Sequence, residues 1–260
     1  MKIVCCVKYV PDATADRRFN SDHTVDRAGV DGVLSELDEY AVEEALKIRE
    51  AGDESEIVVV TMGPDIARAA ILKSLQMGAD SGVHVVDEAI HGSDAVGTSL
   101  VLAKVIEQQQ ADLVLCGMAS TDGSMSVLPA MLAERLGLPQ VTFASEVSLD
   151  GSTVRIRRDG DAATEIIEAT APLLLSVTDQ ANEPRYPSFK GIMAAKKKPV
   201  ETVSLADLGI DAADVGLDAA WTRVEDAQSR PPRSAGTVVT DEDGTGADRL
   251  VEFLAGQKFI

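Results

Sequence analysis

The segment 117–126 carries the residue types best suited to holding an anion. It reads Gly-Met-Ala-Ser-Thr-Asp-Gly-Ser-Met-Ser and stands between an apolar run at 113–116 and a helical pattern at 127–136. Backbone N–H groups ahead of a helix attract negative charge. Hydroxyl groups that could add donors belong to Ser120, Thr121, Ser124 and Ser126. No Walker loop or dinucleotide fingerprint is present, so a phosphate site and an ordinary capped loop both stay open.

Asp122 is a carboxylate inside this segment. A carboxylate beside a phosphate is repelled by it. We therefore expect Asp122 to cap the following helix or to accept a hydrogen bond from a ribose hydroxyl.

Residue combinations typical of catalysis are scarce. His23, His84 and His91 have no candidate nucleophile beside them in the sequence, and no spacing typical of zinc or calcium sites is found. No serine stands in a nucleophile elbow. The sequence therefore favours a binding or carrier protein over an enzyme, and no metal is expected.

A second unusual segment, 182–199, combines apolar and basic residues. It contains three consecutive lysines in a chain of net charge -19. The apolar side chains that could dock onto a partner are those of Phe189, Ile192 and Met193. An exposed docking patch and a strap packed along its own domain are both compatible with this pattern.

The elements that position these residues alternate over the first 140 residues. Short apolar runs predict strands at 3–7, 57–61, 82–86 and 113–116, and helical patterns lie at 36–51, 63–77, 93–109 and 127–136. This order predicts a parallel sheet with right-handed crossovers, whose ligands bind beyond the carboxyl ends of the strands. Ser35 with Asp38 predicts a capping box for the first helix.

Beyond residue 139 the pattern changes to short strands. They are predicted at 141–147, 153–157, 164–169 and 173–178, with hairpin signals between them. The fold class is therefore α/β, with a Rossmann-like parallel-sheet core, an antiparallel strand extension and a C-terminal arm. We expect one domain at 1–200, including a docking loop at 180–200, and an arm at 201–260 with a linker at 230–233 and a helix at 246–255.

The charge and hydropathy of the chain limit its partners. A net charge of -19 argues against nucleic acid, because phosphates must be neutralised by Lys and Arg. No apolar run approaches the roughly 20 residues that span a bilayer, so no membrane insertion is expected. Cys5, Cys6 and Cys116 lie in apolar runs, which favours reduced, buried thiols. With no signal-peptide pattern, we expect a cytoplasmic protein.

Several motifs together resemble the β subunits of electron-transfer flavoproteins. Asn-Glu-Pro-Arg-Tyr at 182–186, followed by Ile-Met-x-Ala-Lys-Lys-Lys at 192–198, is similar to a segment shared by these subunits. Other motifs that match in the same order lie at 7–12, 39–45, 62–64, 77–80, 120–123 and 132–139. The resemblance extends over roughly residues 1 to 210.

The resemblance implies an adenine-nucleotide-binding fold and a heterodimer with an α subunit that holds most of the FAD site. It implies an electron carrier without catalytic residues of its own. Such carriers accept electrons from acyl-CoA and related dehydrogenases and pass them to a quinone oxidoreductase or another acceptor. The arm at 201–260 is expected to pack on the α subunit. Alternatives are an electron-bifurcating subunit with a second FAD in place of AMP, and a stand-alone adenine-nucleotide-binding module.

By position, the resemblance also implies which residues contact a bound AMP. They are Cys6, Ser35, Glu36, Leu37, Asp38, Met62, Gly117, Ala119, Ser120, Thr121, Asp122, Gly123, Ser124, Met125, Ser126, Val127 and Leu128.

Two departures from the family pattern concern this AMP site. Family members usually carry Thr-Gly or Asn-Gln-Thr where this chain has 125–128, and Asn-Pro where it has Ser35-Glu36. Fewer side-chain donors and an added negative charge predict weakened AMP binding. Phe189, in contrast, matches the apolar residue that anchors the family's docking loop in a dehydrogenase pocket.

Overall fold

A computed structural model of the chain describes residues 1–14, 17–52, 54–228, 231, 236, 238–241 and 243–260. The chain forms two compact units, 1–225 and 226–260. The sequence placed the start of the arm at 201, but strand β11 (Val200–Val203) pairs with the sheet of the first unit. The predicted linker at 230–233 lies, apart from Pro231, outside the described residues.

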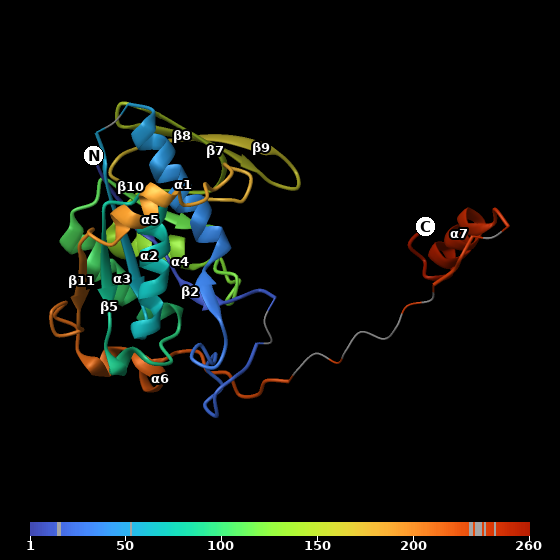
Figure 1. Cartoon of the computed structure of the whole chain (residues 1–260), viewed down its shortest axis with the longest axis horizontal. Helices are drawn as coiled ribbons and strands as arrows, with labels where there is room; N and C mark the ends of the chain where they lie inside the picture. Colours follow the sequence, from blue (N-terminus) through green and yellow to red (C-terminus); the bar gives the residue numbers. More distant parts are fainter. Residues whose placement is uncertain (15–16, 53, 229–230, 232–235, 237, 242) are drawn as a thin grey trace. The chain divides into compact units, whose positions relative to one another are not determined.

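The first unit is built on a sheet whose described strands run in the order β11-β5-β4-β1-β6-β10-β7-β8-β9 (Figure 1). From β11 to β7 every neighbouring pair is parallel, and β7-β8-β9 is antiparallel. The other strands of this sheet are β1 (Lys2–Cys6), β4 (Glu56–Met62), β5 (Ser81–Val85), β6 (Leu113–Gly117), β7 (Gln140–Asp150), β8 (Thr153–Asp159), β9 (Thr164–Thr170) and β10 (Leu173–Val177). The predicted parallel core and antiparallel extension are confirmed.

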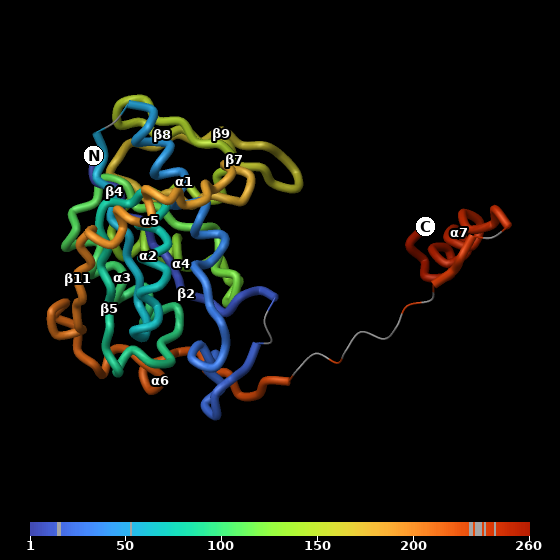
Figure 2. The backbone as a smooth tube through the Cα atoms, in the orientation of Figure 1, coloured from blue at the N-terminus to red at the C-terminus, as the bar shows by residue number. Residues whose placement is uncertain are grey.

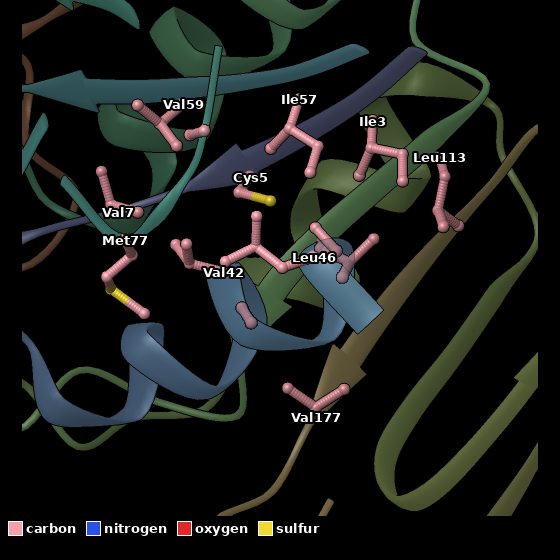
Figure 3. Packing of buried hydrophobic residues seen from close by; sticks show 14 of the residues in the cluster. Ile3, Cys5, Val7, Val42, Leu46, Ile57, Val59, Met77, Leu113 and Val177 are labelled. Carbon is pink, nitrogen blue, oxygen red and sulfur yellow. The ribbon is translucent and has the colours of Figure 1, made fainter. Parts of the chain in front are cut away.

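Helices cover both faces of this sheet, because successive residues of a strand point to opposite sides. On one face, α1 (Glu36–Glu50), α2 (Arg68–Met77) and α5 (Phe189–Ala195) pack over Ile3 and Cys5. On the other face, α3 (Ala95–Gln109) and α4 (Leu128–Leu136) pack over Val4 and Cys6. Figure 3 shows Val42 and Leu46 of α1 directed toward Cys5 and Ile57 of the sheet.

The prediction for β10 is wrong in its direction. Instead of extending the antiparallel ribbon, β10 inserts between β6 and β7 and is parallel to both. All five of its residues are buried, which is typical of a central parallel strand. The edge strand β9, in contrast, is mostly exposed.

The beginning of the second helix also differs from its prediction. Pro64 is extended, and a 3₁₀ turn at Asp65–Ala67 precedes α2, which begins at Arg68 instead of residue 63. A two-stranded ribbon, β2 (Tyr9–Pro11) with β3 (Gly32–Leu34), flanks the segment 12–31.

The second unit contains α7 (Gly246–Gly256), which confirms the predicted terminal helix. Its apolar side chains Leu250, Val251 and Phe253 are exposed. A short helix, α6 (Gly216–Ala219), lies near the end of the first unit. Within the described residues, no helix has the length and apolar character needed to cross a bilayer.

Candidate functional site

The candidate site lies where the strand order of the parallel sheet reverses. β1 pairs with β4 on one side and with β6 on the other, so the chain turns in opposite directions from these two neighbouring strands. Ligands of doubly wound sheets bind at such a switch point, beyond the carboxyl ends of the strands. Lys8 follows β1 and the 117–128 loop follows β6, so the two meet there.

The first turn of α1 closes this site from one side. The capping box predicted for Ser35 and Asp38 is wrong, because neither side chain caps the helix. Instead, the Ser35 hydroxyl accepts a hydrogen bond from the Thr121 backbone N–H at 3.4 Å, and the Asp38 carboxyl accepts one from the Lys8 backbone N–H at 2.8 Å. Both residues are buried, so tertiary contacts replace local capping.

The 117–128 loop holds an unusual backbone conformation. Ser124 and Ser126 have φ of 53° and 56°, which costs energy in residues other than glycine. In the described part of the chain, the backbone N–H groups of Met125, Ser126 and Val127 find no intramolecular acceptor. The loop thus leaves donors available at the switch point, where an anion would use them.

Asp122 is neutralised by two cations. Its carboxyl group accepts a hydrogen bond from the Lys8 ammonium at 2.7 Å and pairs with the Arg27 guanidinium. Burial acts to raise the pKa of Asp122, but the charges of Lys8 and Arg27 outweigh it, so the pKa lies below its ordinary value. Arg17 adds a third cation by donating to the Thr121 carbonyl at 2.7 Å.

This arrangement corrects one expectation for Asp122. The carboxylate does not cap α4, whose N-cap is Val127. Because Lys8 and Arg27 both pair with Asp122, its negative charge is compensated and repels an anion in the loop less strongly. The sequence placed Lys8 directly after a strand and within the 7–12 motif, but it did not predict that Lys8 and Arg27 pair with Asp122 or that Arg17 binds the loop.

Asp38 is a second carboxyl group at the site, and it has a different environment. Burial raises the pKa of Asp38 to about 7, against the opposing effect of the Lys8 backbone N–H. A Cβ added to Gly117 would lie 2.6 Å from the Leu37 carbonyl oxygen and 2.7 Å from the Asp38 carboxyl. Glycine at 117 therefore allows β6 to approach the start of α1 closely.

The remaining residues expected at an AMP site occupy the same end of the sheet. Cys6 ends β1 and Met62 ends β4, with the start of α1 and the 117–128 loop beside β1 and β6. Glu36 is exposed, as is Met125 at 64%. The structure thus assembles these elements at one edge, while their contacts with a nucleotide stay a prediction.

Histidines and cysteines have structural surroundings. Burial lowers the pKa of His84, whose Nε2 lies 3.2 Å from the Gly63 carbonyl oxygen. His91 pairs with Asp22 at 2.7 Å. A hydrogen bond with Cys6, together with burial, raises the pKa of the Cys116 thiol. No cluster of side chains able to hold a metal ion occurs in the described ranges.

The segment 181–198, called the docking segment here, lies on the helical face formed by α1 and α2. Figure 2 lets its path be followed from β10 to α5. It forms the short helix α5 where the sequence predicted a loop, and Ser188 caps this helix by accepting from the Gly191 N–H at 3.1 Å. Phe189 is 81% exposed, and Ile192 and Met193 are also exposed.

Comparison with known proteins extends this picture. A family model described as "Electron transfer flavoprotein domain" matches residues 22–208. The chain is 44% identical to the "Electron transfer flavoprotein subunit beta" of Mycobacterium tuberculosis, with 99% of each chain covered. It is 33% identical to proteins of the same name from Megasphaera elsdenii and Clostridium acetobutylicum, with all of each chain covered.

Proposed function

The chain belongs to the electron transfer flavoprotein family, and we propose that it is the β subunit of a heterodimeric electron carrier whose α subunit holds FAD. In this proposal the β subunit supplies a docking surface and a nucleotide site, and it contributes no acid, base or nucleophile. Electrons come from acyl-CoA or related dehydrogenases and pass to a quinone oxidoreductase or another acceptor.

The observation that carries this proposal is the surface of the docking segment. Phe189, Ile192 and Met193 point their apolar side chains into solvent, although the chain buries most of its large apolar residues. Exposed apolar groups gathered on one element are typical of a protein interaction site. A large exposed aromatic such as Phe189 is the residue type that carries most energy in such interfaces.

Charge supports the same surface. Residues 184–200 contain five basic residues and no acidic residue. Arg185 is paired with Glu43 and Glu50, and Lys198 donates to backbone carbonyls. The charges left exposed are those of Lys190, Lys196 and Lys197. A local positive region on an acidic protein orients an approaching partner that presents acidic groups. The dehydrogenase would therefore present an apolar pocket with acidic groups at its edge.

AMP fits the residues at the switch point, and we propose it as the ligand there. The free N–H groups at 125–127 and the cations Lys8, Arg17 and Arg27 suit its phosphate. AMP supplies no redox chemistry, so its part is structural. Val127 and Leu128 offer no side-chain donor, which supports weaker binding than in typical family members.

For the arm, we propose packing on the α subunit. The second unit, 226–260, is the part of the arm to which this applies, since 201–225 belongs to the first unit. The exposed apolar residues Leu250, Val251 and Phe253 of α7 supply a surface for such packing.

The test is co-expression with the α-type subunit of the same organism, followed by purification and extraction of bound nucleotides. We expect a stable heterodimer with about one FAD and bound AMP below one equivalent. Subunits that purify apart and never show a flavin spectrum would overturn the proposal. Two flavins with NADH oxidation would favour the bifurcating alternative, and a nucleotide-responsive homodimer would favour the stand-alone module.

A further inference from the structure

Helix α1 carries two buried carboxylates that the nucleotide site does not use. Glu43 is 5% exposed and Glu44 is 2% exposed. Glutamate is rarely buried to this extent unless it is paired, because its charge is costly to remove from water. The partners of these two side chains therefore indicate what they are for.

Arg185 of the docking segment is the partner of Glu43. Its Nε and Nη2 atoms donate to the two carboxylate oxygens of Glu43, each at 2.8 Å, and its backbone N–H donates to the same carboxylate at 3.1 Å. Arg185 also donates to Glu50, about two turns further along the same face of α1, at 2.5 and 3.0 Å. Such paired, planar contacts fix both distance and orientation.

Glu44 forms a second attachment beside the first. It accepts a hydrogen bond from the Asn182 side chain at 2.8 Å and one from Lys47 at 2.9 Å. Asn182 also donates to the Tyr40 carbonyl at 3.0 Å, and Lys47 to the Ala181 carbonyl at 3.3 Å. The start of the docking segment is thus held to α1 over two helical turns.

The far end of the docking segment is held by α2. The Lys198 ammonium donates to the Leu75 and Ala79 carbonyls at 3.1 and 2.5 Å. Gly191 lies so close to α2 that an added Cβ would be 2.5 Å from the Gln76 carbonyl oxygen. Helix α5 is therefore fixed from both ends, with Phe189 only four residues beyond Arg185.

From this geometry we infer that Arg185 and Glu43 are positioning residues for docking: their ion pair places Phe189 where the dehydrogenase can receive it. This inference rests on the proposed docking function. Neither side chain needs to touch the partner. A segment already fixed in its bound conformation loses less entropy on association, so the ion pair acts on the affinity for the partner.

The first test is Arg185→Gln in the co-expressed heterodimer. We expect the KM for the reduced dehydrogenase to rise about tenfold, with kcat changed less than about twofold and flavin content unchanged. Arg185→Lys keeps the positive charge but loses the planar paired contacts. Its KM should therefore lie between the wild-type value and that of Arg185→Gln. The matched control is Arg155→Gln, which removes an exposed ion pair between Arg155 on β8 and Glu168 on β9 and should leave KM unchanged.

A second measurement does not depend on electron transfer. Tryptic cleavage after Lys190 in the full-length chain, followed by mass spectrometry, reports how firmly α5 is held. Arg185→Gln should speed this cleavage, whereas Arg155→Gln should not. If Arg185→Gln folds poorly because Glu43 is left unpaired, the double variant Glu43→Gln with Arg185→Gln removes both charges and serves instead.

Unchanged cleavage at Lys190 would overturn the positioning role. Faster cleavage with an unchanged KM would overturn its connection to docking. Failure of the proposed function has a separate signature, since the wild-type heterodimer would then carry no flavin or accept no electrons from any dehydrogenase.

Discussion

Two segments lie beside helix α1, and they differ in what they leave free. One leaves backbone N–H groups without acceptors, and the other leaves apolar side chains exposed. The 117–128 loop, beside the first turn of α1, leaves backbone N–H groups free and takes its side-chain contacts from Lys8 and Arg27. The docking segment, beside the later turns, uses its polar groups for anchoring and leaves Phe189 exposed. A free backbone suits a small anion, and free apolar side chains suit a protein surface.

The carboxyl groups of α1 differ in the same way. Asp38 faces the loop and is buried with a raised pKa, so it is neutral through much of the acidic range. Glu43 faces the docking segment and is buried as a charge, paired with Arg185. The buried carboxyl group at the beginning of α1 therefore has a raised pKa, whereas the one in its middle is paired with an arginine.

The largest effect is expected from Asp38→Asn. The folded-state pKa of Asp38, about 7, lies above its ordinary value of 3.8, so its contribution to stability is complete below pH 4 and is lost as pH rises through 7. Asparagine stays neutral, so the stability of the variant relative to wild type should increase by about 3 kcal/mol between pH 5 and pH 8. Urea unfolding at both pH values measures this; a constant difference between the two proteins would refute it.

Phe189→Ala tests the docking segment. Removing a central aromatic anchor should cost about 2 kcal/mol of binding, which is about a 30-fold rise in KM for the dehydrogenase. Flavin and AMP content should not change, because the loop is untouched. Ile166→Ala, on the edge strand β9, is the matched control for loss of an exposed apolar side chain, measured as dehydrogenase kinetics with the intact heterodimer. Unaltered kinetics for Phe189→Ala would count against the anchor.

Gly123→Val tests the loop without touching the docking segment. An added Cβ would lie 3.1 Å from the Ser120 hydroxyl and 3.9 Å from the Lys8 ammonium, so the branched side chain would crowd the loop and one of its cations. AMP retention should fall about tenfold, the equivalent of one hydrogen bond. Nucleotide extraction and quantification measure it, with Gly160→Val, in the turn between β8 and β9, as a check on general damage. Normal AMP content would remove the loop from the nucleotide site.

Leu128→Thr should have the smallest effect, and in the opposite direction. It adds a hydroxyl donor to the loop of the kind that family members usually carry. AMP affinity should rise about fivefold, from one neutral hydrogen bond of about 1 kcal/mol. Titration of the nucleotide-free heterodimer with AMP measures the gain. An unchanged affinity would show that the phosphate is held by backbone groups and cations alone.

Local pattern predicted most of the first unit. The alternation of apolar runs and helical faces located the parallel strands, because each strand is buried on both sides and each helix on one. The local pattern did not predict the direction of β10, because the pairing of strands that are distant in sequence depends on the whole sheet. The apolar residues of β10 are buried more completely between β6 and β7 than they would be at an edge of the sheet.

The sites were predicted less completely than the fold. The loop was located from its residue types and its place after a strand, but its cations were missed because Arg17 and Arg27 come from a segment about a hundred residues away. Ser35 and Asp38 matched a local capping rule, yet burial against Thr121 and Lys8 took their side chains elsewhere. The sequence left a docking patch and a packed strap open for the docking segment. The structure shows that its polar groups pack it against α1 and α2, with the side chains of Phe189, Ile192 and Met193 exposed. Docking itself stays a prediction.

The three consecutive lysines of the docking segment are not equivalent. Lys196 and Lys197 are exposed, whereas the ammonium group of Lys198 donates to the carbonyls of Leu75, in α2, and Ala79, just beyond it, and burial lowers the pKa of Lys198. An amine-reactive reagent or an acetylating enzyme would therefore meet two open sites followed by an enclosed one. In a mutational scan, Lys198 should behave as part of the folded core and its two neighbours as part of the surface. Three identical neighbours in the sequence thus have two different environments, two in solvent and one packed against the fold.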